Sequence, residues 1–355
     1  MKQEALSAII EAMPGPVLVI NDVERIEAAN AAARRLIGQR VVDRSYVAML
    51  RQPALLEAIE ACLRERTPRH AHYFSNDGAE AITFRVHVRA VEAATEIAGM
   101  PVMLTFEDIT QVNAAEQMRR DFVANVSHEL RTPLTALMGF IETLQGPARN
   151  DPAAQDRFLN IMQTQAERMN RLVGDLLSLS RVEETARVRP KGIINLSEGV
   201  EAVIALMRPM AQEEGAVLHY RSDHEDIQIR GDRDQITQVI TNLIENAIKY
   251  GASGEEIDVD VSISERDPLL RAEGVRIVVT DKGPGIDPVH LPRLTERFYR
   301  ADNHRSRELG GTGLGLAIVK HIVSRHRGRM RIDSVVGEGT KITVVLPLDV
   351  DDPFA

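Results

Sequence analysis

The sequence predicts an α+β protein of several domains, and three observations point to this fold class. At 355 residues the chain exceeds what one ordinary hydrophobic core holds, so two or three domains are expected. Hydrophobic residues make up 44% of it, which is enough for globular cores. Its middle part has the apolar spacing of long helices, whereas both flanks alternate short strands, turns and helices. The expected domains span residues 1–108, 109–190 and 191–350.

Composition limits the classes of function. The formal net charge is −9, which argues against direct binding to nucleic acid, because such binding needs basic surfaces. The single cysteine, Cys62, excludes an internal disulfide and fits a reducing compartment, so a cytoplasmic location is expected. The N-terminus lacks a signal-peptide pattern, and no apolar run approaches the ~20 residues of a membrane span. Membrane association is therefore expected only if the natural chain extends upstream of Met1.

Residues 1–108 combine short strands with short helices. Asn30 is a candidate N-cap for an Ala-rich helix that Gly38 ends. Hairpins are predicted from residues 17–20 with 25–27 and from 71–74 with 82–88 around the turn Asn76-Asp77-Gly78, and residues 103–108 supply a last strand. This order, including the closing Phe106-Glu107-Asp108-Ile109-Thr110, resembles a PAS sensor domain.

The residues leave the ligand of this PAS-like region open. His70, His72 and His87 could indicate haem, but their spacing fits the surface positions of strands, which is the commoner situation for histidine. No flavin-cysteine motif surrounds Cys62. A module that dimerises or relays a signal without a ligand is the simplest interpretation.

Two long helices are expected between residues 109 and 190. Apolar residues recur every four or seven positions up to about Gln145, and the loop from Gly146 to Pro152 follows. A second series alternates steps of three and four: Leu159, Met162, Ala166, Met169, Val173 and Leu176. A lone helical hairpin covers only part of its apolar stripe, so two copies are expected to pair as a four-helix bundle in a homodimer.

From about Ile193 the pattern predicts an α/β domain. Ser197 is a candidate cap for a helix through Ala211, and Asp232 with Gln235 resembles a capping box that opens a helix over 235–250. Strands are expected at 217–220, 227–230, 257–263, 275–280, 330–335 and 341–346, with a further helix at 316–325.

His128 is the candidate nucleophile of the first long helix. Histidine is mostly neutral near pH 7, so a ring nitrogen can attack a phosphoryl group. Glu129 can take or orient the ring proton, and Thr132, on the face of Glu129, could hold a water for the reverse, hydrolytic reaction. Pro133 crowds the carbonyl of Glu129 and is expected to loosen the helix there. The plainer interpretation is a surface histidine beside an incidental proline.

The whole run Ser127-His128-Glu129-Leu130-Arg131-Thr132-Pro133-Leu134 resembles the phosphoacceptor box of sensor histidine kinases almost letter for letter. That specificity favours the nucleophile over the plainer interpretation.

Two downstream segments supply the first half of a predicted nucleotide pocket. One helix face carries Asn242, Asn246 and Lys249, and Tyr250 is the last residue of that helix. The amide oxygen of Asn246 suits Mg²⁺, and Lys249 offers charge to phosphates. Asp281 follows a strand, and its carboxylate can accept from the exocyclic amine of adenine. Gly283 and Gly285 let the backbone pass close to the base.

Two more segments complete the pocket. The run Arg297-Phe298-Tyr299-Arg300 offers cations and an aromatic anchor beside residues 301–309, which are expected to form a mobile lid. Gly311, Thr312, Gly313, Leu314 and Gly315 open the 316–325 helix, where backbone N–H groups can bind phosphates. Each segment alone fits ordinary turns or caps. In this order they resemble the N, G1, F and G2 boxes of the ATPase fold shared by histidine kinases, gyrase, MutL and Hsp90-type chaperones.

The resemblance covers residues 109–348 and implies an ATP- and Mg²⁺-dependent protein histidine autokinase. It also implies phosphoryl transfer to an aspartate on the receiver domain of a separate response regulator in a two-component system. Hydrolases of this superfamily carry a glutamate where Asn242 stands, and an amide cannot serve as a base, which favours a kinase over an ATPase.

Two alternatives remain at this point: a sensor that acts mainly as a phosphatase through Glu129 and Thr132, and a dimeric scaffold without enzymatic activity. The segment from His290 to Arg300, with Thr295 in place of the usual aromatic, is similar to the phosphate-regulon sensor kinases. Signalling of phosphate starvation is therefore one hypothesis for the role of the chain.

Overall fold

The computed structural model describes residues 8–76, 81–91, 101–185, 188–251, 256–301 and 311–348. It divides into two compact units, Met1–Ala124 and Asn125–Ala355, which are treated one at a time below. Within the described ranges, no helix combines the length and the apolar character needed to cross a membrane.

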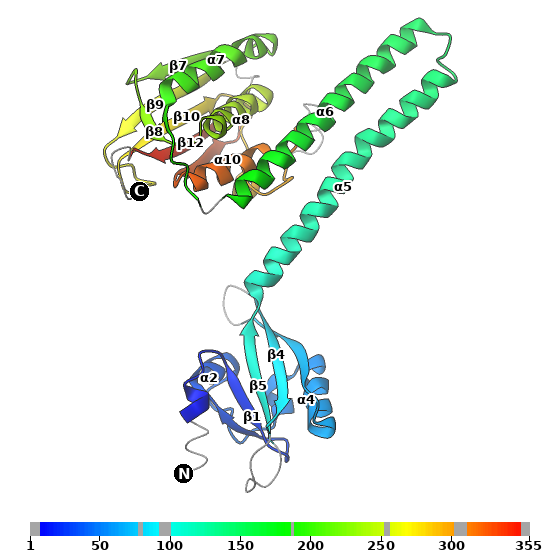
Figure 1. Ribbon diagram of the computed structural model, residues 1–355, viewed down its shortest axis with the longest axis vertical. Coiled ribbons are helices and arrows are strands. Elements are labelled where there is room, and N and C mark those ends of the chain that lie inside the picture. Colours follow the sequence, from blue (N-terminus) through cyan, green and yellow to red (C-terminus); the bar gives the residue numbers. More distant parts are fainter. Residues whose placement is uncertain are drawn as a thin grey trace. The chain divides into compact units, whose positions relative to one another are not determined.

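The first unit is an antiparallel five-stranded sheet with the strand order β2-β1-β5-β4-β3. Its strands are β1 (Val17–Ile20), β2 (Ile26–Ala29), β3 (Arg69–Ser75), β4 (Ile82–Ala90) and β5 (Val102–Asp108), and its helices are α2 (Ala31–Ile37), α3 (Tyr46–Leu50) and α4 (Pro53–Glu65) (Figure 1). Tyr46, Leu55 and Ile59 from the helices meet Phe84 and Leu104 from the sheet in one buried core.

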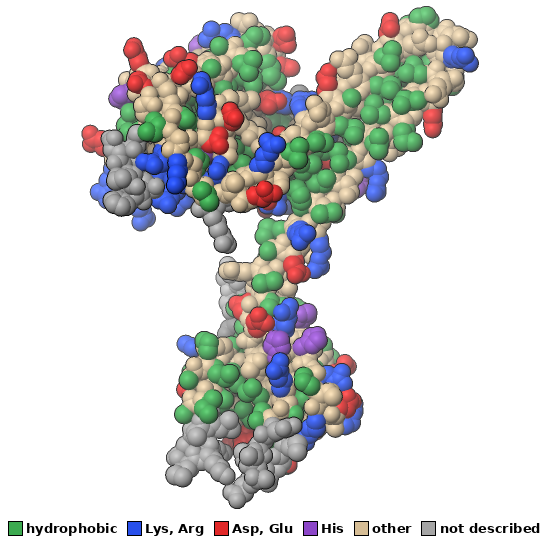
Figure 2. Space-filling model, in the orientation of Figure 1, with side chains coloured by type: hydrophobic (Ala, Val, Ile, Leu, Met, Phe, Trp, Pro, Cys, Tyr) green, Lys and Arg blue, Asp and Glu red, His purple; other side chains and the backbone are tan. Residues whose placement is uncertain are grey.

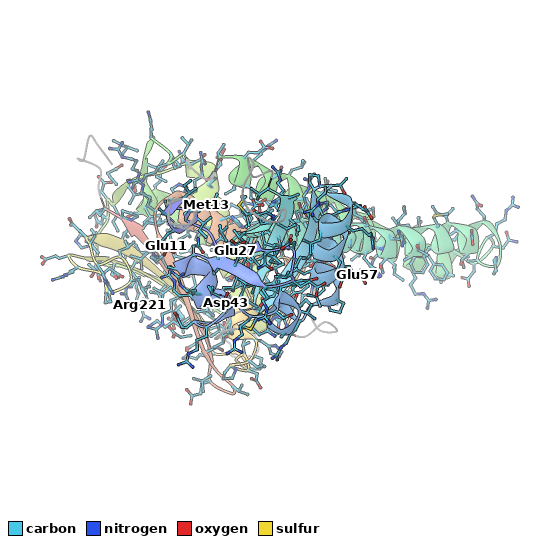
Figure 3. All side chains as sticks on the ribbon, turned by 90° about the horizontal axis from the view of Figure 1, so that it is seen from below. Glu11, Met13, Glu27, Asp43, Glu57 and Arg221 are labelled. Carbon is cyan, nitrogen blue, oxygen red and sulfur yellow. The ribbon has the colours of Figure 1, made fainter. Side chains whose placement is uncertain are left out.

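Asn30 holds the start of this unit together, as its predicted capping role requires. Its Oδ1 accepts from the backbone N–H of Ala33 at 2.9 Å and of Val17 at 3.0 Å, so one buried side chain caps α2 and fixes β1. Glu11, labelled in Figure 3, accepts from the N–H of Ala31 at 3.1 Å and pairs with Arg34. These contacts tie the preceding helical turn to α2.

The predicted strands of this unit are confirmed, with the turn residues 77–80 outside the described part. The expected hairpins are β1 with β2 and β3 with β4, and the histidines of the second hairpin lie on its outer face: His70 and His72 are exposed and His87 is half-buried. Cys62 is buried in α4, where burial raises the pKa of its thiol. Helix α4 was not predicted from the sequence.

The second unit begins with two long helices and continues into an α/β domain. The helices are α5 (Thr110–Gln145), which starts in the first unit, and α6 (Pro152–Glu184), which Asp151 caps by accepting from the N–H of Ala154 at 3.1 Å. Pro133 lies inside α5 without ending it. The predicted helical hairpin and its connecting loop are therefore confirmed.

The α/β domain has a five-stranded sheet of order β11-β12-β10-β9-β7, in which only β7 and β9 pair in parallel. Its elements are β6 (Ile193–Asn195), α7 (Leu196–Glu213), β7 (Val217–Ser222), β8 (Gln228–Arg230), α8 (Arg233–Gly251), β9 (Glu256–Ser264), β10 (Gly274–Asp281), the 3-10 helix η2 (Leu291–Arg293), α10 (Gly315–Arg325), β11 (Arg329–Val335) and β12 (Gly339–Pro347). Helices α7, α8 and α10 lie on one face of this sheet (Figure 1).

Two predicted caps in this domain need correction. Asn195, not Ser197, caps α7: its Oδ1 accepts from the N–H of Glu198 at 3.1 Å, and Ser197 lies inside the helix. Asp232 does cap α8, but the capping box is incomplete, because Oε1 of Gln235 is buried without a hydrogen-bond partner in the described part of the chain. The short pair of β6 with β8 was not foreseen in full, since β6 has only three residues.

Candidate catalytic site

The predicted phosphoacceptor, His128, is exposed on α5. Thr132 lies one turn further along the same helix, and its Oγ1 donates to the carbonyl of His128 at 3.2 Å. The imidazole thus stands on a rigid element and is open to another group that approaches from solvent.

Glu129 does not face the imidazole beside it, because adjacent positions on a helix point in different directions. Its carboxylate pairs with two guanidinium groups: Nη2 of Arg300 lies 3.1 Å and Nη2 of Arg168 lies 3.3 Å from Oε2. The Arg300 side chain is only 4% exposed and that of Glu129 20%. The expected contact of Glu129 with the ring proton is therefore not made in this arrangement.

Helix α8 presents the first predicted segment of the pocket. Leu243, Ile244, Ala247 and Ile248 are buried, whereas Asn242, Asn246, Lys249 and Tyr250 are half-buried, as their spacing on the helix predicts. Nδ2 of Asn242 donates to the carbonyl of Gly315 at 3.4 Å. The ammonium of Lys249 binds Oε1 of Glu245 at 2.5 Å, so in this state its charge is shared with a carboxylate.

Asp281 closes β10 and packs against the end of α8. A Cβ on Gly251 would lie 2.3 Å from Cβ of Asp281, and one on Gly283 would lie 2.6 Å from Cα of Gly251, so only glycine fits either position. Oδ1 of Asp281 accepts from the N–H of Gly283 at 2.9 Å. Burial raises the pKa of Asp281, although the N–H groups of Gly283 and Thr340 oppose that shift.

Two left-handed glycines bring the remaining segments close. Gly285 has φ +68°, and a Cβ there would lie 2.0 Å from the carbonyl oxygen of Val335. Gly313 has φ +72°, and its carbonyl accepts from the N–H of Phe298 at 2.8 Å. The segment from Arg297 to Arg300 is thereby bonded to the start of α10. The four predicted segments do converge, through Gly251 with Asp281, Asn242 with Gly315, and Phe298 with Gly313.

The segment from Gly311 to Gly315 has the features of an anion site. Leu314 is the N-cap residue of α10 and makes no side-chain cap, so the first-turn N–H groups are left for another acceptor. The hydroxyl of Thr312 accepts from the N–H of Leu314 at 3.3 Å and donates to Oδ2 of Asp175 at 2.7 Å. The predicted lid, residues 301–309, lies outside the described residues except for Ala301.

Some of the partners that side chains have at this site were not predicted from the sequence. Arg297, expected near the nucleotide, forms an ion pair with Glu183 of α6, and Asp175 and Arg168 of α6 bind Thr312 and Glu129. A signal did exist for Asp175: it lies between the buried Leu172 and Leu179, on the apolar face where a charge needs a partner.

Three family descriptions match consecutive parts of the chain. They are "PAS fold" for residues 10–114, "His Kinase A (phospho-acceptor) domain" for 118–185, and "Histidine kinase-, DNA gyrase B-, and HSP90-like ATPase" for 231–350. The sensor protein kinase WalK of Staphylococcus aureus is 32% identical over 351 residues, which cover 98% of this chain and 82% of that protein. The chain belongs to the sensor histidine kinases.

Other sensor histidine kinases match about two thirds of this chain at higher identity. The phosphate regulon sensor protein PhoR of Pseudomonas aeruginosa is 42% identical over 244 residues, which are 68% of this chain and 53% of that protein. The sensor histidine kinase WalK of Bacillus subtilis is 39% identical over 240 residues, 68% of this chain and 38% of that protein. The matched regions thus span about half or less of these two relatives.

A solved structure shares the fold of this sensor histidine kinase. It is the histidine kinase ThkA in complex with the response regulator protein TrrA, with a TM-score of 0.50, 22% identity, and coverage of 97% of this chain and 99% of that one. The predicted fold class is confirmed: a PAS-like α/β domain, a helical hairpin, and an α/β domain of the ATPase family.

Proposed function

We propose that this sensor histidine kinase binds ATP against α8, the Asp281–Gly285 turn and the Gly311–Gly315 segment, and phosphorylates His128. The observation that carries the proposal is the convergence of these segments through glycine contacts too tight for any other residue. An exposed imidazole on a helix of the same unit supplies the acceptor. The phosphoryl group then passes to an aspartate of a response-regulator receiver domain.

The chemistry balances with the residues of this chain. A lone pair on a ring nitrogen of His128 attacks the γ-phosphorus, the bond to the β–γ bridging oxygen breaks, and ADP leaves. The phosphorylated ring must then lose the proton on its other nitrogen. Glu129 is the neighbouring carboxylate that can accept it, which requires release from Arg300, because the ion pairs with Arg300 and Arg168 hold its oxygens away from the ring.

Different side chains of the pocket are assigned to different parts of the nucleotide. Asp281 accepts from the exocyclic amine of adenine, whereas a guanine carbonyl at that point would be repelled. Mg²⁺ fits the donor set of α8, where the amide oxygen of Asn246 is the hard ligand this ion prefers; when bound, it neutralises phosphate charge. Lys249 reaches the phosphates once it leaves Glu245, and Tyr250 and Arg297 flank the site.

The helical hairpin supports a homodimer. Leu134, Met138 and Ile141 of α5 and Leu159, Val173 and Leu177 of α6 are between 42% and 57% exposed, which is unusual for so many large apolar side chains on one hairpin. Figure 2 shows hydrophobic atoms gathered along this pair of helices. A second hairpin would cover them as a four-helix bundle.

Two finer assignments are part of the proposal. The hydroxyl of Thr132, one turn from His128, favours an additional phosphatase activity towards the response regulator. Signalling of phosphate starvation draws support from the 42% identity with PhoR, but WalK of Bacillus subtilis is 39% identical over a region of similar length. The stimulus must therefore be tested directly, with phosphate-limited and phosphate-rich cells compared for phosphorylation of His128.

The pocket assignment is tested with ATP labelled at the γ-phosphate. Asn246→Ala should abolish labelling of the protein, because it removes the proposed ligand of Mg²⁺, while circular dichroism stays unchanged. Asn160→Ala, on the exposed surface of α6, is the matched control and should label as the wild type does. Normal labelling of Asn246→Ala would show that the pocket lies elsewhere.

A further inference from the structure

Three acidic side chains of the helical hairpin bind the ATPase-type domain of the same unit. Asp175 accepts from Thr312 at 2.7 Å, Glu183 pairs with Arg297, and Glu129 pairs with Arg300 at 3.1 Å. We call these three pairs the docked contacts. On the ATPase-type domain they involve Arg297, Arg300 and Thr312, which all belong to segments of the proposed nucleotide pocket. Helix α10 packs along α6 beside them (Figure 1).

Asp175 differs from the other two carboxylates in what it binds. Glu129 and Glu183 meet arginines, whereas Asp175 meets a neutral hydroxyl at the segment that opens α10. It is half-buried on α6 between Leu172 and Leu179, and burial raises the pKa of its carboxyl group, with the Thr312 hydroxyl opposing that shift. The charges of Lys249 and Arg171 also act on this carboxyl group but do not outweigh the effect of burial, and hydrophobic packing does not explain an acid at such a position.

A phosphate group and this carboxylate need the same donors. The Thr312 hydroxyl has one proton to donate, and it already donates to Asp175. A phosphate at the first turn of α10 would also lie close to a second anion in a partly desolvated site, where like charges repel strongly.

We propose that Asp175 is a positioning residue that competes with the phosphates of ATP for Thr312, so that nucleotide binding and the docked contacts oppose each other. The proposal rests on the function proposed above and names its regulation. By linkage, ATP weakens docking by the same factor by which docking weakens ATP binding, so a change that removes docking strengthens ATP binding. Loss of docking also frees Glu129 from Arg300, which places the proton acceptor of His128 under control of the nucleotide.

Binding of the non-hydrolysable analogue AMP-PNP tests the competition in the full chain. Asp175→Asn keeps the size and an acceptor oxygen but removes the charge, so the dissociation constant should fall at least threefold. Glu167→Gln makes the same charge change at an exposed position of α6, where Glu167 accepts from Gln163, and should stay within twofold of wild type. An unchanged constant for Asp175→Asn would overturn the proposal.

Hydrogen–deuterium exchange of the wild type provides a second test of the proposal, which needs no variant. Saturating AMP-PNP should speed amide exchange in residues 172–182 at least threefold, because docking is lost; slower or equal exchange contradicts the proposal, even if Asp175→Asn fails to fold. The kinase assignment fails separately: a wild type that neither binds AMP-PNP nor labels His128 refutes the proposed function, whereas normal binding and labelling with no effect at Asp175 refutes only this inference.

Discussion

Asp281 is the residue whose charge should set the response of the pocket to pH. Burial raises the pKa of its carboxyl group, against the N–H groups of Gly283 and Thr340. Acceptance from the adenine amine needs the charged carboxylate, which is fully present only above this raised pKa. ATP affinity should therefore decline as pH falls through it, starting above the usual range for aspartate.

Calorimetric titration with AMP-PNP measures this effect when it is repeated from about pH 4.5 to about pH 8, a range that starts just above the ordinary pKa of aspartate. Asp281→Asn should lower affinity at pH 8 by about tenfold or more, since one charge-assisted hydrogen bond contributes roughly 1.5–3 kcal/mol. It should also remove the acid-side decline, whereas Asp226→Asn, at an exposed position, should leave it. A wild-type affinity that stays level to the ordinary aspartate range would contradict the assigned role.

Single residues were predictable from the sequence where their role is local. The cap at Asn30 and the exposure of His128 follow from neighbours a few positions away. Pairs of distant residues were not: Glu129 and Arg300 are 171 positions apart, and no periodicity links them. The pair of Lys249 with Glu245 is local and has the i, i+4 spacing of helix ion pairs, so the sequence does contain the signal for it.

At the scale of the element, Gly251 shows how the end of α8 is shaped by its neighbour. A Cβ there would lie 2.3 Å from Asp281, so Gly251→Ala must push the Asp281 turn away. AMP-PNP affinity should fall at least tenfold, and the free energy of unfolding should drop by about 1–3 kcal/mol, as for other overpacked sites.

Gly199 is the matched control, because nothing lies within 4 Å of a Cβ built there inside α7. Gly199→Ala should raise the free energy of unfolding by roughly 0.5–1 kcal/mol through helix propensity and leave nucleotide affinity unchanged. Urea unfolding and calorimetry of both variants make the comparison. Equal behaviour of the two alanines would refute the close approach of α8 and the Asp281 turn.

Elements were predictable where their apolar period is long. The strands of the C-terminal sheet, with Ile257, Val259 and Val261 buried in alternation, and the two long helices show their period in the sequence. The three-residue strand β6 is too short to show one. The cap of α7 was misplaced by two residues because Asn195 and Ser197 are both good N-cap residues, and only the fold decides between them.

At the scale of the whole molecule, the account requires two copies of the chain. Met138 is 57% and Leu177 is 55% exposed, on the two helices of the hairpin. Met138→Glu combined with Leu177→Glu should convert the dimer to a monomer in sedimentation velocity at micromolar concentration, because each substitution buries charge in the bundle. Val289→Glu, which alters a 68% exposed apolar residue of the ATPase-type domain, should leave the dimer intact. A monomeric wild type would contradict the proposed bundle.

The family of the chain was predictable because its motifs are short, ordered runs: Ser127 to Leu134 on one helix and four segments between Asn242 and Gly315. The proposed opposition between the docked contacts and nucleotide binding was not predictable from the sequence. It depends on the packing of α6 against α10 and on Asp175, which no motif contains. The stimulus and the cognate regulator depend on surfaces whose chemistry the shared motifs do not encode.

The most direct test of the central claim is the chemistry and location of the phosphoryl group after incubation with γ-labelled ATP. The account predicts one label that is lost in acid, survives in base, maps by mass spectrometry to His128, and is absent from His128→Ala. A label that persists in His128→Ala, or a wild type that takes up none while still binding AMP-PNP, would contradict it.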